Sequence, residues 1–115
     1  MQIQVVHSHL NNFKLNSETS SLFDAYFIPV TCSGAVLTNP MVDVMNKMVV
    51  DCSRAGANVL FVAVLGPGGQ EQVHVKHKED NKFLVEFMME ESGKHILYIK
   101  WGDHNIPGSP FLLEV

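Results

Sequence analysis

The chain is poor in the residues on which several protein classes depend. Its 115 residues include only two cysteines, which are too few for a disulfide scaffold. Lysine and arginine total 8 against 12 acidic residues, giving a net charge of −4, so the clustered positive charge needed by a nucleic-acid or anionic membrane surface is missing. No apolar run approaches the roughly 20 residues that span a bilayer. Met1 to Gln4 also lack the charged and apolar regions of a signal peptide. We therefore expect a reduced, cytoplasmic protein that neither binds nucleic acid nor inserts into membranes.

Catalytic and metal-binding patterns are also scarce. His7 and His9 would share one side of a strand, but His74 and His77 are three apart and would point to opposite faces, with no cysteine or carboxylate set to complete a tetrahedral site. Cys52 has no paired base and is expected to be a small buried hydrophobe with a raised pKa. We therefore predict no metal, no cofactor and no enzyme activity.

The length and the periodicity predict one all-β domain. A chain of this length buries roughly 65% of the surface that it exposes when unfolded, so it needs no crosslinks to fold. From about Met45 onward, apolar and polar residues alternate in short segments separated by turn residues. This pattern predicts an immunoglobulin-like antiparallel β-sandwich of seven strands. The expected strands lie at 37–44, 48–52, 58–64, 72–78, 82–88, 94–101 and 110–115.

The first 33 residues fit this pattern less well. Leu10 to Ser21 is rich in asparagine and serine and resembles a polar linker, whereas Leu22 to Val30 carries more aromatic mass than a free linker should. We therefore assign residues 1–33 to a hinge-like linker that can be partly docked, and residues 34–115 to the folded domain.

Ile106-Pro107-Gly108-Ser109-Pro110-Phe111 is the most specific turn in the chain. Pro107 fixes φ near −65° and Gly108 can take a positive φ, which predicts a type II turn that opens the last strand. Together with Val49-Val50-Asp51-Cys52-Ser53-Arg54-Ala55-Gly56 and Leu60-Phe61-Val62-Ala63-Val64-Leu65-Gly66-Pro67-Gly68-Gly69, it resembles the immunoglobulin-like repeat of filamin. In one departure, Gly93-Lys94-His95 places a histidine where that family has a corner tyrosine.

The resemblance is strongest to the C-terminal dimerisation repeat, through Val50 to Gly56 and Lys100 to Asp103. It implies a non-catalytic self-association module of an actin-crosslinking cytoskeletal scaffold, with actin bound only through domains absent from this chain. The partner would be a second copy, forming a homodimer. The alternative implied is an internal-type repeat that binds the cytoplasmic tail of an adhesion receptor or a signalling protein by β-strand addition.

The strand at 58–64 carries the candidate interface. If Leu60, Val62 and Val64 face the core, then Val59, Phe61 and Ala63 face outward, where a free sandwich is normally polar. We expect this apolar stripe to meet a partner, together with His74 and Lys76 of the strand at 72–78; these two strands are C and D in the family's lettering. The alternative is that the segment from Tyr26 to Val30 of the same chain folds over the stripe and covers it, and the sequence leaves both possibilities open.

Overall fold

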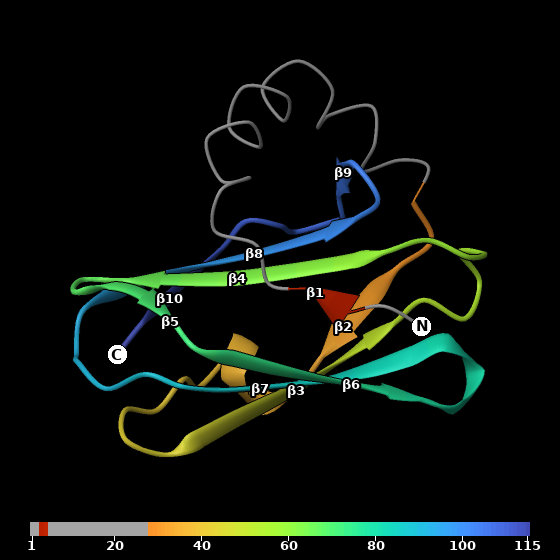
Figure 1. Ribbon diagram of the computed structural model, residues 1–115. Coiled ribbons are helices and arrows are strands. Elements are labelled where there is room, and N and C mark those ends of the chain that lie inside the picture. The colour runs from red at the N-terminus through yellow and green to blue at the C-terminus, as the bar shows by residue number, and fades with distance from the viewer. Residues whose placement is uncertain (1–2, 5–27) are drawn as a thin grey trace.

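The computed structural model describes residues 3–4 and 28–115, which form two β-sheets packed face to face (Figure 1). The elements are β1 (Ile3–Gln4), β2 (Thr31–Ser33), η1 (Ala35–Leu37), β3 (Met45–Asp51), β4 (Leu60–Gly66), β5 (Gly69–Glu71), β6 (Val73–Lys78), η2 (Glu79–Asn81), β7 (Lys82–Met88), β8 (Lys94–Trp101), β9 (His104–Asn105) and β10 (Phe111–Glu114).

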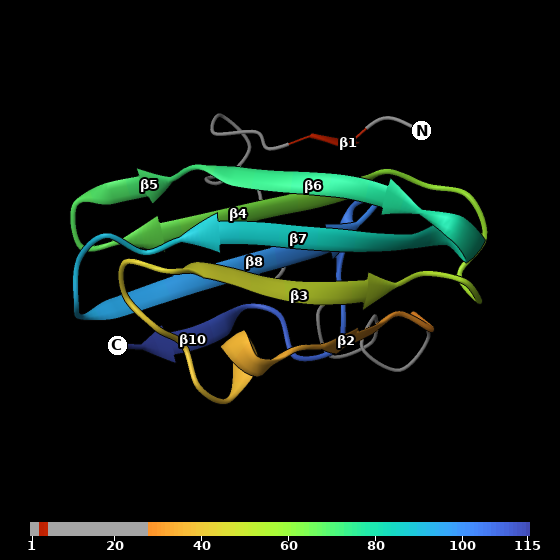
Figure 2. The same ribbon diagram turned by 90° about the horizontal axis from the view of Figure 1, so that it is seen from below.

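The strand order is that of an immunoglobulin-like sandwich. One sheet runs β1-β4-β8-β10, with β5 paired to β4 and β9 paired to β8, and the other runs β2-β3-β7-β6. All pairs are antiparallel except β1 with β4, which is parallel. The predicted fold class is therefore confirmed. β2 begins at the end of the sandwich opposite the C-terminus (Figure 2).

The core lies between the sheets and follows from the alternation. In β3 and β7 every second side chain is buried, as expected for strands with one face toward the core. Trp101 joins this core, where its ring lies 6.0 Å from that of Phe83 in an edge-on arrangement, and its indole nitrogen donates a 3.4 Å hydrogen bond to the carbonyl of Ala55.

The expected first strand at 37–44 is wrong. That segment begins at the last residue of the short helix η1 and continues into a turn in which Asp43 has φ 59°, and its one ladder contact is an isolated bridge between Val42 and Met89. β2 takes the place of this strand and pairs with β3. The physical cause is Gly34, whose φ of 147° turns the chain out of the sheet directly after Ser33.

The sandwich consequently extends upstream of residue 34. Val30 is buried in the core and Ile28 packs against it, so residues that we assigned to the linker belong to the folded unit. Within the assigned linker, Ile3 and Gln4 form β1, whereas residues 5–27, which include Leu10 to Ser21, lie outside the described residues.

The final turn has the predicted geometry. The amide of Ser109 donates a 3.0 Å hydrogen bond to the carbonyl of Ile106, and Gly108 has φ 93°. These are features of a type II turn with Pro107 and Gly108 at its centre.

Candidate interaction surfaces at the β4 and β6 edges

β4 and β6 lie on the same side of the sandwich, opposite β10 and β2 (Figure 2). β6 is the outermost strand of its sheet. β1 pairs in parallel with β4 and places Ile3 opposite Leu60 and Gln4 opposite Phe61. The edge of β4 therefore carries an additional, two-residue extended segment in this structure.

The apolar stripe of β4 has the predicted orientation but not the predicted exposure. Phe61 and Ala63 form a cluster with Tyr98 that is separate from the main core. Only Val59 is exposed, at 42%, whereas Phe61 is 6% and Ala63 0% exposed. The expectation of an exposed stripe is therefore wrong for Phe61 and Ala63.

A sequence signal for this burial was present. From Leu60 to Leu65 the chain is apolar at every position, and such a continuous run is typical of a strand that is buried on both faces. Alternation within the run indicates which side chains face the core, but it does not indicate whether the side chains on the other face of the strand are covered.

The alternative cover for the stripe, Tyr26 to Val30, is only partly described. Ile28 and Val30 pack on the main core between the sheets, and neither belongs to the Phe61 cluster. Tyr26 and Phe27 lie outside the described residues.

His74 and Lys76 are exposed on the outer face of the β2-β3-β7-β6 sheet. Lys76 Nζ lies 3.6 Å from Glu86 Oε1, and Lys47 Nζ lies 3.7 Å from Glu86 Oε2. The side chains of β6 that pack against the core are Val73 and Val75. The structure thus places His74 and Lys76 on one outer face of the sandwich and the Phe61 cluster on the other, so the five predicted interface residues form no single continuous patch.

Reactive side chains are held in unreactive settings. Burial, the largest cause, raises the pKa of both thiols to about 12, and the neighbouring Cys52 adds to the shift at Cys32. The prediction of a buried Cys52 with a raised pKa is confirmed. Within residues 3–4 and 28–115, no group of three or more histidine, cysteine or acidic side chains is placed to hold a metal ion.

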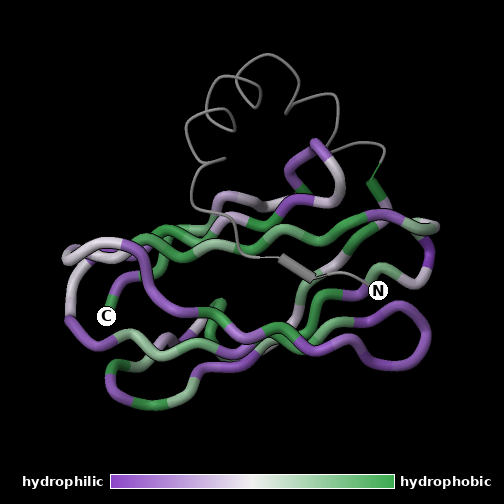
Figure 3. Tube along the Cα trace, in the orientation of Figure 1, coloured by the Kyte–Doolittle hydropathy of each residue, from purple (hydrophilic) through white to green (hydrophobic). Residues whose placement is uncertain are grey.

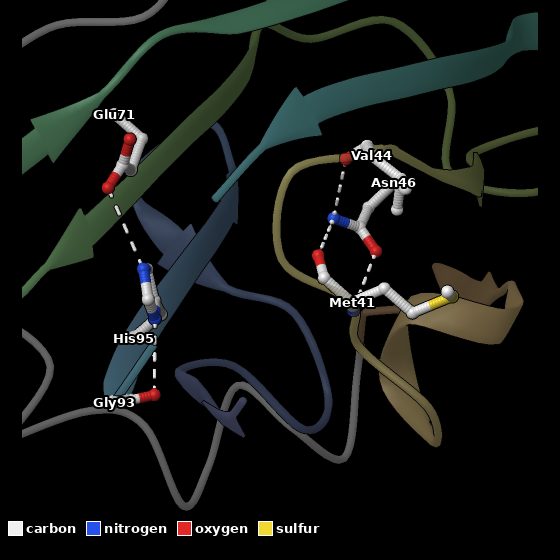
Figure 4. Close-up of polar contacts among 6 residues, drawn as sticks. All are labelled: Met41, Val44, Asn46, Glu71, Gly93 and His95. Atoms are coloured by element: carbon white, nitrogen blue, oxygen red, sulfur yellow. Dashed lines mark hydrogen bonds and ion pairs between the residues drawn. The ribbon is translucent and has the colours of Figure 1, made fainter. Parts of the chain in front are cut away.

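The corner histidine is buried and faces two acceptors. His95 Nδ1 lies 3.3 Å from the carbonyl oxygen of Gly93, and Nε2 lies 3.6 Å from Glu71 Oε2 (Figure 4). A β-carbon on Gly66 would lie within 2.8 Å of both the His95 ring and the Glu71 carboxylate, so glycine there makes room for the pair. His95 thus lies between β5 and the turn before β8, and its Nδ1 is the ring nitrogen within hydrogen-bonding distance of a partner, the carbonyl of Gly93.

The sheet order and the turns define an immunoglobulin-like β-sandwich repeat. The profile of the family described as Filamin/ABP280 repeat matches residues 27–112, and the chain belongs to this family. It is 41% identical over 87 residues to Filamin-C of Rattus norvegicus and of Mus musculus, and 37% identical over 87 residues to Filamin-A of Drosophila melanogaster. Each match covers 75% of this chain.

These relatives are far longer than the chain, which spans 3% to 4% of their length. Among solved structures, the crystal structure of the Lin-41 filamin domain superposes with a TM-score of 0.65 at 15% identity, covering 74% of this chain and 89% of that domain. That likeness supports the fold. No helix in the described part of the chain is long and apolar enough to cross a membrane.

Proposed function

We propose that this repeat is a non-catalytic interaction module of an actin-crosslinking cytoskeletal scaffold in the cytoplasm, and that partners bind where the edges of β4 and β6 lie side by side. The observation that carries the proposal is the pairing of β1 with β4. An edge strand that accepts one extended segment offers the same backbone groups to another. Actin itself would be bound by other domains of such a scaffold.

The binding mode that this observation favours is β-strand addition. An extended segment, such as the cytoplasmic tail of an adhesion receptor or a signalling protein, would pair with β4 and lay alternate side chains toward the half-buried Val73 and Val75 of β6. Because β1 already occupies part of this edge, such a segment must replace it. Residues 1–27 would then lower the apparent affinity of the repeat for its partners.

Self-association is the second candidate, supported by the position of β6. This strand ends its sheet, and the exposed Val59 lies just before β4 on the same side of the sandwich. Two copies related by a two-fold axis would bring these edges together, with His74 and Lys76 at the rim of the contact.

Deleting residues 1–27 tests the proposal, because it removes β1 and retains Val30 and β2. The probe is a fluorescent peptide with the sequence of residues 1–6, and its control is the same peptide methylated on the backbone nitrogens of Ile3 and Gln4. We expect the truncated domain to bind the unmodified peptide more tightly than the full chain does, and the methylated peptide to bind weakly to both. Equal binding of both peptides would contradict strand addition. Light scattering of the same samples measures their mass. A dimer that does not bind the peptide would favour self-association instead.

A further inference from the structure

Exposed apolar side chains are concentrated at one end of the β2-β3-β7-β6 sheet. Eight large apolar residues of the described chain are exposed, and five of them lie in the loop before β3, at the start of β3 or at the end of β7. Figure 3 shows the apolar loop at this end of the sheet. We call these five residues the methionine patch: Met41, Val42, Val44, Met45 and Met88. Single exposed apolar residues are ordinary, but a cluster of this kind marks a contact surface.

The patch is held in place by buried polar contacts. The Asn46 side chain donates to the carbonyls of Met41 (2.8 Å) and Val44 (3.2 Å) and accepts from the amide of Met41 at 3.1 Å (Figure 4). The amide of Asp43 donates to the carbonyl of Met89 at 2.9 Å. The loop is thus fixed with its apolar side chains exposed, and a surface ordered in advance loses less entropy on binding.

The charge within the patch is negative. Asp43 lies between Val42 and Val44, and the exposed Glu90 follows two residues after Met88 in the sequence. The nearest cation along the sequence, Lys47, is paired with Glu86. A two-fold contact between copies centred on the patch would bring Asp43 toward its own equivalent, so the charge disfavours a second copy of this chain. It favours a partner with positive residues beside large apolar ones.

The geometry also restricts how a partner can bind. β7 is paired with β3 on one edge and with β6 on the other, and β3 is paired with β7 along its whole length. On the other edge of β3, β2 pairs only with Val49 to Asp51, and Gly34 packs so closely beside Lys47 and Met48 that an added strand has little room there. Contact must be made through side chains. An amphipathic helix presents such side chains in a stripe, and methionine side chains adapt to varied apolar partners.

We propose that the methionine patch is a docking surface for a basic amphipathic helix of another protein, with leucine-like side chains seated on Met41, Met45 and Met88 and a lysine or arginine beside Asp43. This surface is distinct from the β4 and β6 edges, so the two proposals stand or fall separately.

The test uses the full chain and two synthetic helical peptides. One contains leucine and lysine at amphipathic helical spacing, and the matched control has glutamate in place of lysine. With methyl-labelled methionines, we expect the lysine peptide to shift the NMR signals of Met41, Met45 and Met88 and to leave the buried Met48 and Met89 unchanged. Affinity is measured by fluorescence anisotropy.

Three variants complete the test. Met45→Gln should weaken binding of the lysine peptide about fivefold or more, because it removes an apolar anchor. Asp43→Asn should weaken it about threefold, since asparagine tolerates the left-handed backbone but lacks the charge. Leu112→Gln, on β10 in the other sheet, should leave affinity unchanged although Leu112 is 61% exposed.

Three results would overturn the proposal. The first is equal binding of the lysine and glutamate peptides, and the second is an equal loss of affinity in Leu112→Gln. The third is a concentration-dependent increase in sedimentation mass that Met45→Gln abolishes, which would make a second copy the occupant. Unchanged Trp101 fluorescence in each variant would show that the fold is intact.

Discussion

At the scale of single residues, Asn81 connects two parts of the chain that are far apart in the sequence. Its side-chain nitrogen donates to the backbone carbonyls of Cys52 (2.9 Å) and Gly56 (2.8 Å). Its backbone carbonyl accepts a hydrogen bond from the amide of Cys52 at 3.0 Å. Its φ of 58° lies in the left-handed region. Asparagine suits the position because it both tolerates this conformation and bonds to nearby backbone.

We expect Asn81→Ala to lower the free energy of unfolding by about 2 to 3 kcal/mol, because two carbonyls lose a donor and alanine is strained in the left-handed region. Urea unfolding measures this. Asn81→Gly removes the same hydrogen bonds without the strain and should recover only part of the loss. Full recovery by glycine would mean that the hydrogen bonds contribute nothing.

The two cysteines predict a specific pH dependence. Burial raises the pKa of each thiol from 9.0 to about 12 in the folded protein, so the folded state holds these protons more tightly than the unfolded chain does. Their contribution to stability is complete below pH 9 and is lost as the pH rises toward 12. The melting temperature should therefore fall less steeply above pH 9 in Cys52→Ala than in the unaltered protein. Parallel curves for the two proteins would contradict this prediction.

At the scale of elements, the sequence predicted β7 and β8 at their observed bounds, began β3 three residues late, and placed the first strand wrongly. Strands that alternate strictly, such as β3 and β7, need only their own residues to indicate which face is buried. β2 has three residues and is a strand only because β3 offers it an edge, so its own composition carries little signal. The burial of Phe61 was missed for a related reason, since alternation places a side chain on a face but says nothing about what lies over that face; only the unbroken apolar run from Leu60 to Leu65 indicates burial on both faces. The edges of the two predicted interface strands lie on the same side of the sandwich. However, β4 and β6 belong to different sheets, so their outward faces lie on opposite faces of the sandwich.

Gly34 is the glycine on which the exit from β2 depends. A β-carbon there would lie 2.8 Å from both the carbonyl oxygen of Lys47 and the Cα of Met48, which are backbone atoms of β3. We expect Gly34→Ala to cost about 2 to 4 kcal/mol of unfolding free energy, combining backbone strain with a clash that side-chain movement cannot relieve. Gly56→Ala is the matched control, because Gly56 also has a positive φ (75°) but a β-carbon added to it would meet no atom within 4 Å. Its expected cost is about 1 kcal/mol. If thermal or urea melts showed the same loss of unfolding free energy in both variants, the structure around residue 34 would have relaxed to relieve the clash.

At the scale of the whole molecule, one core joins both sheets. Its buried side chains come from β3 and β7 on one side and from β4 and β8 on the other, and the only tryptophan of the sequence lies among them. Unfolding should therefore be a single cooperative transition. We expect the urea midpoints from Trp101 fluorescence and from far-ultraviolet circular dichroism to coincide. Separate midpoints would indicate that one sheet loses its structure before the other.

The opposed positions of β2 and the C-terminus decide how the sandwich would respond to mechanical load. A force applied between residue 28 and Val115 would pull β2 along β3 and β10 along β8, because each strand runs lengthwise between these ends (Figure 2). The hydrogen bonds between paired strands lie perpendicular to the strands. A force along the strands therefore loads all the bonds of a pair at the same time and does not break them one after another. β2 has three paired residues against four for β10. Tension would therefore release β2 first and uncover the edge of β3 while the rest of the sandwich stays folded.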